Sequence, residues 1–359
     1  MNVLVVNAGS SSLKLSVLGE DDTVLAQHHV ERWDGTPDLD LDLTLPPVDA
    51  VGHRVVHGGT RFTTPTVITP DVRRGIEELT DLAPLHQPRA LAGIDAAQAL
   101  FPDVPHVACF DTAFHRTLPA AAATYPLPSA WRERWDLRRY GFHGLSHAYA
   151  SRRAVELAGG GSRVVTCHLG AGCSLAAVHD GRSVDTTMGF TPLAGLPMAT
   201  RSGDLDPGLL LHLLDHLTPD KLADGLAHHS GLRGLAGHAD LRDVHAASAQ
   251  GDVNARLALD VFTHRLRQGI AAMTASLGGL DLLVFTGGIG EHDPDVRARV
   301  VDGLAFLGLA LNRGANAAAS GDAGIGAERS RVPVWVVTAR EDIEIADGTR
   351  TALAADIVL

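Results

Sequence analysis

The sequence lacks the features that define several classes of protein. Only three of its 359 residues are cysteine and no C-x-x-C pair occurs, which argues against a disulfide framework and a structural zinc site. No apolar run is long enough to cross a membrane, and the chain enters the β-branched run Val3–Val6 without a basic leader. We therefore expect a soluble cytoplasmic protein with no membrane partner.

Positive charge is also scarce. The chain has 30 lysine and arginine residues against 42 aspartate and glutamate residues, a formal net charge of −12. Nucleic-acid-binding proteins normally carry a basic stripe, so we expect no nucleic-acid partner, whereas a few buried arginines could still bind a small anion. The signatures G-x-x-x-x-G-K-[ST] and G-x-G-x-x-G are absent, which excludes a P-loop and a Rossmann site.

The residues that are present indicate a globular α/β protein with two domains. Hydrophobic residues make up 45% of the chain and charged residues 20%, and 359 residues are too many for one ordinary core. Strand-like runs alternate with helical periodicity, which predicts mixed sheets. The clearest expected elements are helices over 252–276, from Asp293 and Pro294 towards Phe306, and over 341–355, and a strand over 332–337.

Two strand–turn–strand segments resemble each other. One covers residues 3–18 and turns at Gly9, and the other covers residues 164–178 and turns at Gly170. An internal repeat of this kind implies two similarly folded halves. Chance similarity between two hairpin turns is the alternative.

Both turns are rich in glycine and small polar residues, as is a third segment, 287–291, after the strand 282–286. Glycine lets backbone N–H groups approach a phosphate, and small hydroxyls add donors. One such turn is more often only a turn, but three at the carboxyl ends of buried strands favour a ligand site. The predicted phosphate cradles are Asn7, Gly9, Ser10, Ser12 and Lys14 in the first turn and residues 168–172 in the second.

Two arginines stand in unusual surroundings. Arg54 lies in G-H-R-V-V-H-G-G and Arg201 in M-A-T-R-S-G, both among apolar and glycine residues. A guanidinium buried beside glycine suits bidentate capture of a carboxylate or a phosphoryl group. The alternative for each is a structural arginine paired with an acid inside the sheet.

Two histidines and two acids complete the candidate chemistry. His143 lies between glycines after an aromatic residue, and His86 lies at an expected helix start. An imidazole there could stabilise a phosphoryl group in transfer, although a lone histidine is more often structural. Asp111 ends an apolar stretch and could orient magnesium or the acceptor, and Glu341 follows the expected strand 332–337 and could hold a magnesium-bound water. Helix capping and the helix dipole are the alternatives for these acids.

Together these motifs resemble the acetate kinase family, within the actin-like, sugar-kinase-like phosphotransferases. The resemblance covers nearly the whole chain, in order and at similar spacing. Its motifs are N-A-G-S-S-S-L-K at 7–14, G-H-R-V-V-H-G-G at 52–59, L-A-P-L-H at 82–86, F-D-T-A-F-H at 110–115, Y-G-F-H-G at 140–144, H-L-G-x-G at 168–172, M-G-F-T-P-L at 188–193, R-S-G-D-L-D-P at 201–207, D-L-R-D at 240–243 and G-I-G-E at 288–291.

The resemblance implies an α/β fold of two duplicated actin-like (ribonuclease H-like) domains with mixed sheets and an interdomain active-site cleft. The N-terminal domain would cover residues 1–114 and 343–359, and the nucleotide-binding domain residues 115–342. It further implies a homodimer that transfers a phosphoryl group between ATP and acetate, giving ADP and acetyl phosphate reversibly and in line. Mg²⁺, or Mn²⁺, would be the metal.

The resemblance also assigns roles by position. Asn7 and Glu341 would help to place the metal, and the catalytic residues would be Arg54, Asp111, His143 and Arg201. The acetate site would comprise Arg54, Val56, Leu85, His86, Phe142 and Pro192. The nucleotide would be bound by Ser10, Ser12, Lys14, His168, Leu169, Gly170, Ala171, Gly172, Asp240, Leu241, Arg242, Gly288, Ile289, Gly290, Glu291 and His292.

The chain departs from the family pattern at several positions. Ala171 and His292 stand where the family usually has asparagine, so nucleotide contacts and donor preference are open. Arg340 replaces a smaller polar residue before Glu341, and the stretch from Leu18 to Gly52 is short. A propionate or butyrate kinase is the nearest alternative, because one methylene gives little discrimination. More distant alternatives are a non-catalytic nucleotide-binding regulator and a metal-binding protein with nineteen histidines.

Overall fold

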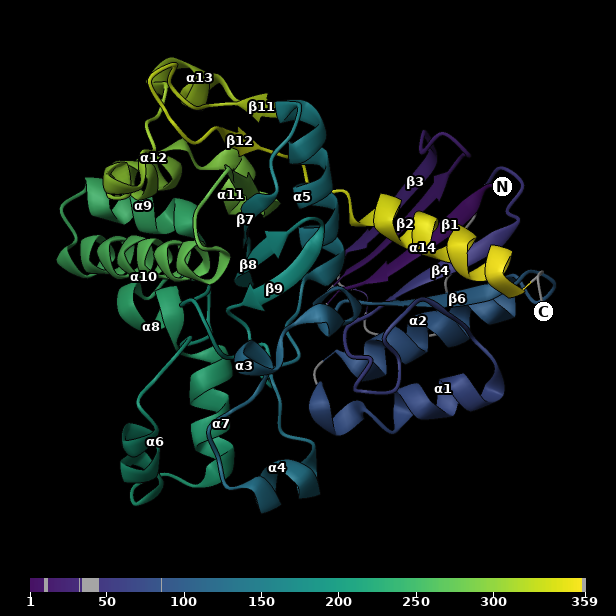
Figure 1. Ribbon diagram of the computed structural model, residues 1–359. Coiled ribbons are helices and arrows are strands. Elements are labelled where there is room, and N and C mark those ends of the chain that lie inside the picture. The colour runs from purple at the N-terminus through teal and green to yellow at the C-terminus, as the bar shows by residue number, and fades with distance from the viewer. Residues whose placement is uncertain (10–11, 32, 34–44, 85, 357–359) are drawn as a thin grey trace. The chain divides into compact units, whose positions relative to one another are not determined.

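The structure is a computed structural model that describes residues 1–359 except 10–11, 32, 34–44, 85 and 357–359. The described chain forms two compact units, each with its own sheet (Figure 1). The first unit comprises Met1–Arg116, Phe142–Tyr149 and Arg340–Leu359, and the second comprises Thr117–Gly141 and Ala150–Ala339. The domain boundaries expected from the sequence, at residues 114 and 342, remain a prediction.

The first unit contains a six-stranded mixed sheet in the order β3-β2-β1-β4-β6-β5. The β1–β2–β3 segment is an antiparallel meander, while β1, β4 and β6 are parallel and β5 pairs with β6 antiparallel. The strands are β1 (Val3–Ala8), β2 (Ser12–Leu18), β3 (Val24–Glu31), β4 (Ala50–Val55), β5 (Thr66–Val67) and β6 (His106–Phe110).

Helices cover both faces of this sheet. Leu4 and Val6 pack in a cluster with Ala97 of α2, whereas Val3 and Val5 pack with Ile345 of α14. The unbroken apolar run of β1 is explained by this two-sided burial. The helices are α1 (Pro70–Glu77), α2 (Gln87–Leu100) and α14 (Glu341–Asp356), with 3₁₀ turns η1 (Thr80–Leu82) and η2 (Ala113–Thr117).

The second unit repeats the first. Its sheet has the order β11-β12-β10-β7-β8-β9, which is the first order with each strand replaced by its counterpart and read from the opposite edge. Parallel and antiparallel pairings also correspond, so the predicted duplication is confirmed. The strands are β7 (Arg163–Leu169), β8 (Cys173–His179), β9 (Arg182–Thr186), β10 (Leu282–Thr286), β11 (Ala323–Gly324) and β12 (Val334–Val336).

The predicted helix over 252–276 is confirmed as α10 (Val253–Leu277). The Asp252 carboxylate accepts the N–H groups of Asn254 and Ala255 at 2.8 and 3.1 Å, which caps the helix start, and Gly278 ends it. The other helices are α3 (Ala120–Ala123), α4 (Ser129–Trp135), α5 (Gly144–Ala158), α6 (Pro207–Leu214), α7 (Pro219–His228), α8 (Gly231–Ala236), α9 (Leu241–Ala249), α11 (Gly287–His292), α12 (Pro294–Asp302), η3 (Ala305–Leu307) and α13 (Arg313–Ala318).

Several expectations differ from the structure in detail. The glycine-rich segment after β10 is not an open turn but the short helix α11. The N–H of Asp293, the residue after this helix, donates to the carbonyl of Ile289. The strand expected over 332–337 is shorter, and α12 ends at Asp302, before a separate 3₁₀ turn. The short stretch between Leu18 and Gly52 supplies the edge strand β3. Among the described helices, none combines the length and apolarity that a membrane span requires.

Candidate active site

Arg54 and Asp111 form a buried ion pair at the ends of adjacent parallel strands. Arg54 is in β4 and Asp111 follows β6. Arg54 Nε donates to Asp111 Oδ1 at 3.1 Å and Nη2 donates to Oδ2 at 2.6 Å. Their side chains are 16% and 1% exposed. The paired-arginine alternative is therefore realised for Arg54, and Asp111 engages this guanidinium instead of capping the next turn.

Asn7 and Glu341 extend this pair into a group of four, called here the Arg54 cluster. Asn7 lies half-buried near the end of β1, and its Oδ1 accepts from Arg54 Nη1 at 3.3 Å while its Nδ2 donates to Glu341 Oε2 at 3.0 Å. Glu341 opens α14, and its Oε2 lies 3.8 Å from Arg54 Nε. Burial raises the pKa of Asp111, and the Arg54 guanidinium opposes that rise. Burial disfavours the charged form of Arg54, but Asp111 and Glu341 more than offset this, and its pKa is raised.

The Arg54 cluster retains capacity for an anion. A guanidinium has five N–H groups, and hydrogen bonds to Asp111 and Asn7 account for three of them. Among the described residues, one N–H on each Nη atom of Arg54 is left for another acceptor. A carboxylate or a phosphoryl group could accept these two N–H groups.

His143 adopts a strained backbone conformation beside Asp111. Its φ is +55°, in the left-handed region that few residues other than glycine adopt. The N–H of Gly144 donates to the carbonyl of Asp111 at 2.9 Å, which joins the two segments. The half-buried His143 side chain follows Phe142, which is 1% exposed. The structure thus brings His143 next to the Asp111 segment within the first unit.

The predicted acetate residues of the first unit lie on connected segments. Val56 is 7% exposed, and the ring of the following His57 meets Phe142 edge-on at 5.5 Å between centroids. Gln87 Nε2 donates to the carbonyl of His57 at 2.9 Å and so holds this segment to the start of α2. His86 precedes α2, as the sequence predicts. Leu85 lies outside the described residues.

Arg201 belongs to the second unit and contrasts with Arg54. Its Nη1 donates to the carbonyl of Pro192 at 3.3 Å and approaches Met198 Sδ at 3.8 Å. Burial lowers the pKa of Arg201, although a guanidinium remains charged at neutral pH. Across the part of the chain that the structure describes, no carboxylate forms an ion pair with it. Pro192 and Arg201 are therefore brought together, and the described residues supply no carboxylate to balance this cation.

The Arg201 loop is braced by backbone hydrogen bonds from the start of α8. The N–H groups of Ser230 and Arg233 donate to the carbonyls of Thr200 and Ala199 at 2.9 and 3.0 Å. Asp204 Oδ1 accepts the N–H of Gly195 at 2.7 Å and closes the loop on itself. The loop is consequently a fixed support for the Arg201 guanidinium.

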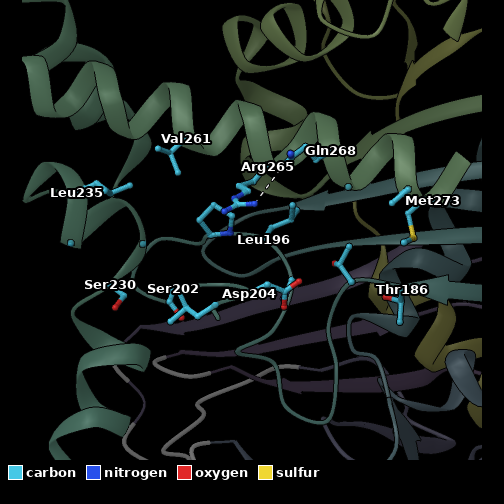
Figure 2. Close-up of a pocket in the computed structure, with 18 of the residues that line it drawn as sticks. Thr186, Leu196, Ser202, Asp204, Ser230, Leu235, Val261, Arg265, Gln268 and Met273 are labelled. Atoms are coloured by element: carbon cyan, nitrogen blue, oxygen red, sulfur yellow. Dashed lines mark hydrogen bonds between the residues drawn. The ribbon is translucent and has the colours of Figure 1, made fainter. Parts of the chain in front are cut away.

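A pocket of about 710 Å³ adjoins this loop (Figure 2). Leu196, Ser202 and Asp204 line it from the loop side, while Arg265 and Gln268 of α10 lie opposite, joined by a hydrogen bond of 3.2 Å. None of the residues that the sequence assigns to acetate or nucleotide lines it. The pocket is therefore separate from the predicted contacts, although it borders the segment that carries Arg201.

Two predicted nucleotide segments of the second unit meet at Gly287. This residue has φ +78°, and a Cβ atom there would lie 2.8 Å from the carbonyl oxygen of Leu169. Only glycine therefore lets the start of α11 approach the end of β7 this closely. The segments 168–172 and 288–292 are neighbours for this reason.

Two charged side chains hold α11 in place. The Glu291 carboxylate accepts the N–H groups of Gly287 and Ala339 at 3.1 and 3.0 Å, so this predicted nucleotide residue shapes its own segment. Arg297 of α12 is 1% exposed and donates to the carbonyls of Gly290 and Glu291 at 2.9 and 2.8 Å. Sequence reasoning missed Arg297. An arginine on the same helical face as Val300 and Val301 was the available signal.

The remaining nucleotide candidates are mostly accessible. Lys14 is exposed and is the register partner of Asn7 across the β1–β2 hairpin, which puts the two side chains on one face of the sheet. Arg242 donates to Asp240 and lowers the pKa of that carboxyl to about 2. Ala171 and His292 are exposed. Ser10 and the side chain of Ser12 lie outside what the structure describes.

Arg340, the remaining departure in this region, has its own counterion. Its Nε donates to Asp342 Oδ1 at 2.9 Å, and both side chains are half-buried. The hydrogen bond to Asp342 raises the pKa of Arg340. Arg340 thus pairs with Asp342, while Glu341 contacts Asn7 and Arg54.

The chain is similar to known proteins over almost its whole length. A family model described as the acetokinase family matches residues 39–347. The chain is 48% identical to an acetate kinase of Leifsonia xyli over 98% of this chain and 99% of the relative, and 46% identical to one of Clavibacter michiganensis over 98% of both.

Solved structures give the same result. An acetate kinase of Porphyromonas gingivalis matches with a TM-score of 0.90 and 36% identity, covering 98% of this chain and 99% of the other. A propionate kinase of Francisella tularensis matches with a TM-score of 0.88 and 34% identity over the same shares. The chain therefore belongs to the acetokinase family.

Proposed function

We propose that the protein transfers the γ-phosphoryl group of ATP to acetate, giving acetyl phosphate and ADP, and catalyses the reverse reaction. The observation that carries this proposal is Arg201, a largely buried guanidinium with no carboxylate partner among the described residues. A buried cation without a counterion is costly unless the ligand supplies the anion. Both acetate and the transferring phosphoryl group are anions of the right kind.

In the proposed reaction a bond forms between an acetate oxygen and the γ-phosphorus, while the bond from that phosphorus to the β–γ bridging oxygen breaks. Acetate is ionised at neutral pH, so no base has to remove a proton from it. The protein has to align the reactants and neutralise charge. We assign acetate alignment to the two remaining Nη N–H groups of Arg54, and charge neutralisation on the migrating group to Arg201 and His143.

The proposal requires the residues of both units to act on one pair of substrates. Val56, Phe142 and His86 of the first unit and Pro192 of the second would surround the acetate methyl group, together with Leu85. The nucleotide would be bound by Lys14 and by the segments 168–172, 240–242 and 288–292. Because these residues would surround both substrates, water would be excluded from ATP during the transfer.

We further propose that Mg²⁺, or Mn²⁺, accompanies the nucleotide at the Arg54 cluster. In the described part of the chain no three His, Cys, Asp or Glu side chains gather as a metal site. Magnesium typically uses only one or two carboxylates beside phosphate oxygens and water, which fits Glu341 and Asn7. With two carboxylates and one guanidinium, the cluster carries a net negative charge that a cation would balance. Bound metal would neutralise charge on the phosphates.

Propionate is the second candidate acceptor, because the Francisella tularensis protein that the chain resembles is named as a propionate kinase. One additional methylene is worth about 1–3 kcal/mol in an apolar pocket. Val56 is buried and larger than glycine or alanine, which favours the smaller acid.

We also propose a cytoplasmic homodimer. The helix α6 exposes Leu209, Leu211 and Leu214 to 43%, 68% and 44%, an apolar surface that a second copy could cover. The three buried free cysteines suit a reducing compartment that supplies ATP. Light scattering on the purified protein would measure twice the 37.7 kDa of one chain.

A hydroxamate assay tests the activity. Purified protein is incubated with ATP, Mg²⁺ and hydroxylamine together with acetate, propionate or butyrate, and acyl hydroxamate is measured. We expect kcat/KM to be highest for acetate. Higher kcat/KM for propionate would identify the second candidate, and absence of any acyl phosphate with all three acids would contradict the proposed function.

A further inference from the structure

An ion pair joins two of the segments proposed to bind the nucleotide. His245 is on α9, which begins directly after Asp240, and Asp293 directly follows His292 at the end of α11. His245 Nε2 lies 2.8 Å from Asp293 Oδ2, and the side chains are 29% and 15% exposed. The contact therefore connects α9 with the α11–α12 junction inside the second unit.

Asp293 uses its two carboxylate oxygens for different purposes. Oδ1 accepts the N–H of Val296 at 2.9 Å, which caps α12, and Oδ2 binds His245. The cap anchors Asp293 to α12, and α12 in turn holds α11 through Arg297. Movement of α9 relative to α11 would consequently break the ion pair.

We propose that His245 is a positioning residue for the nucleotide, because its ion pair with Asp293 keeps the segments 240–242 and 288–292 at the spacing that ATP requires. This inference rests on the proposed function. His245 would touch neither the phosphates nor acetate, so loss of the ion pair would weaken ATP binding while leaving the transfer step intact.

The surrounding charges make the ion pair between His245 and Asp293 dependent on pH. Asp293 faces His245, and so do Asp295 and Arg299 of α12, with Asp295 Oδ2 3.8 Å from His245 Nδ1. Arg299 also forms an ion pair with Asp260 of α10. The hydrogen bond to Asp293 raises the pKa of His245. Burial would raise the pKa of Asp293, but His245 and the amide of Val296 lower it. The ion pair is therefore fully formed below the ordinary histidine pKa, and it is lost as the pH rises through the raised pKa of His245.

The experiment measures KM for ATP, KM for acetate and kcat from about pH 6 to about pH 9. His245→Gln removes the charge, and His245→Lys keeps a positive charge across this range. His179→Gln is the matched control, because His179 forms a similar pair with Asp180 at 3.2 Å on the β8–β9 turn, away from the nucleotide segments. Melting temperatures of all variants report on stability.

We expect His245→Gln to raise KM for ATP by about three- to tenfold near pH 6.5 and to change kcat and KM for acetate less than about twofold. In the parent protein KM for ATP should increase towards the His245→Gln value at alkaline pH. His245→Lys should keep KM for ATP low throughout, and His179→Gln should match the parent protein. A purely structural role would lower the melting temperature without this pH profile.

Two results separate failure of this inference from failure of the proposed function. If KM for ATP is unchanged in His245→Gln across the pH range while acetyl phosphate forms normally, the positioning role of His245 is wrong and the proposed function stands. If the parent protein forms no acyl phosphate, calorimetric titration with ADP still decides the matter. Equal ADP affinity of the parent protein and His245→Gln, or no ADP binding by either, also contradicts the positioning role of His245.

Discussion

Arg54 of the first unit and Arg201 of the second differ in what surrounds them. Arg54 is paired with a buried carboxylate and keeps two N–H groups for a ligand, whereas Arg201 contacts a carbonyl and a sulfur atom and has no carboxylate partner among the described residues. Paired burial makes Arg54 part of the folded framework as well as part of the site. The isolated charge of Arg201 contributes little to folding and is suited to bind an anion.

Replacement of Arg201 by alanine should therefore affect catalysis far more than stability. We expect kcat to fall by at least about two orders of magnitude, since removal of one stabilising donor typically costs that much. The melting temperature should stay the same or rise, because a buried cation without a counterion is removed. Arg265→Ala, at an exposed arginine whose hydrogen bond goes to Gln268, is the control. Near-normal hydroxamate formation by Arg201→Ala would refute its assigned role.

Replacement of Arg54 should affect both properties. Arg54→Ala leaves the Asp111 carboxylate, 1% exposed, without its partner, which should cost about 3–5 kcal/mol of unfolding free energy. The double variant Arg54→Met, Asp111→Asn should recover much of this loss in urea unfolding and yet remain inactive in the hydroxamate assay. Recovered activity in the double variant would show that Arg54 acts only in folding.

At the scale of elements, the nucleotide half of the candidate site depends on short segments being held close together. The helix α11 has six residues and could not persist alone. Glu291 ties its start to Ala339, and Arg297 binds its last carbonyls. The close approach of α11 to Leu169 then depends on the missing side chain of Gly287.

Gly287→Ala tests this approach. The added Cβ would meet the carbonyl of Leu169 at 2.8 Å, in addition to the strain of a left-handed alanine. The matched control is Gly181→Ala, where φ is +74° and no atom lies within 4 Å of the added Cβ. We expect Gly181→Ala to cost about 1 kcal/mol and Gly287→Ala at least about 2 kcal/mol, with a severalfold higher KM for ATP only in the latter. Equal effects of both variants in urea unfolding and kinetics would contradict this.

At the scale of the whole molecule, the described part of the first unit buries His53, His57, His106, His115 and His147, and burial disfavours the charged form of the first three. Burial lowers the pKa of His53 and of His106, whose rings stack at 5.2 Å, and lowers the pKa of His57 to about 4. The unfolded chain binds protons on these residues near pH 6.5, and the folded chain does not. Their contribution to stability is therefore present above about pH 6.5 and is lost as the pH falls.

Urea unfolding at about pH 7.5 and about pH 5 measures this effect. We expect the unfolding midpoint to be clearly lower at the acidic pH, with His57 contributing up to roughly 3 kcal/mol across its full shift. His57→Asn can still accept the N–H of Gly59, which His57 Nδ1 accepts at 2.9 Å, but cannot be protonated. The fall in this variant should be smaller than in the parent protein. An equal fall in both would exclude His57 as a source of the acid sensitivity.

The sequence by itself determined the local elements and much of the chemistry. The hairpins, the capped helix α10 and the paired glycine turns follow from residue preferences that act over a few positions. The motifs around Arg54, Asp111, His143 and Arg201 also pointed to the family before any geometry was known. Their roles in catalysis stay predictions.

Only the tertiary structure decided which of these residues meet. Asn7 and Glu341 are 334 positions apart in the chain and share a hydrogen bond, while Arg54 finds its partner 57 positions away. No local preference encodes such pairings, because they arise when buried faces of sheet and helix exclude water together. The ion pairs of Arg54 with Asp111 and of His245 with Asp293 have the same origin, as does the lack of a carboxylate partner for Arg201 among the described residues.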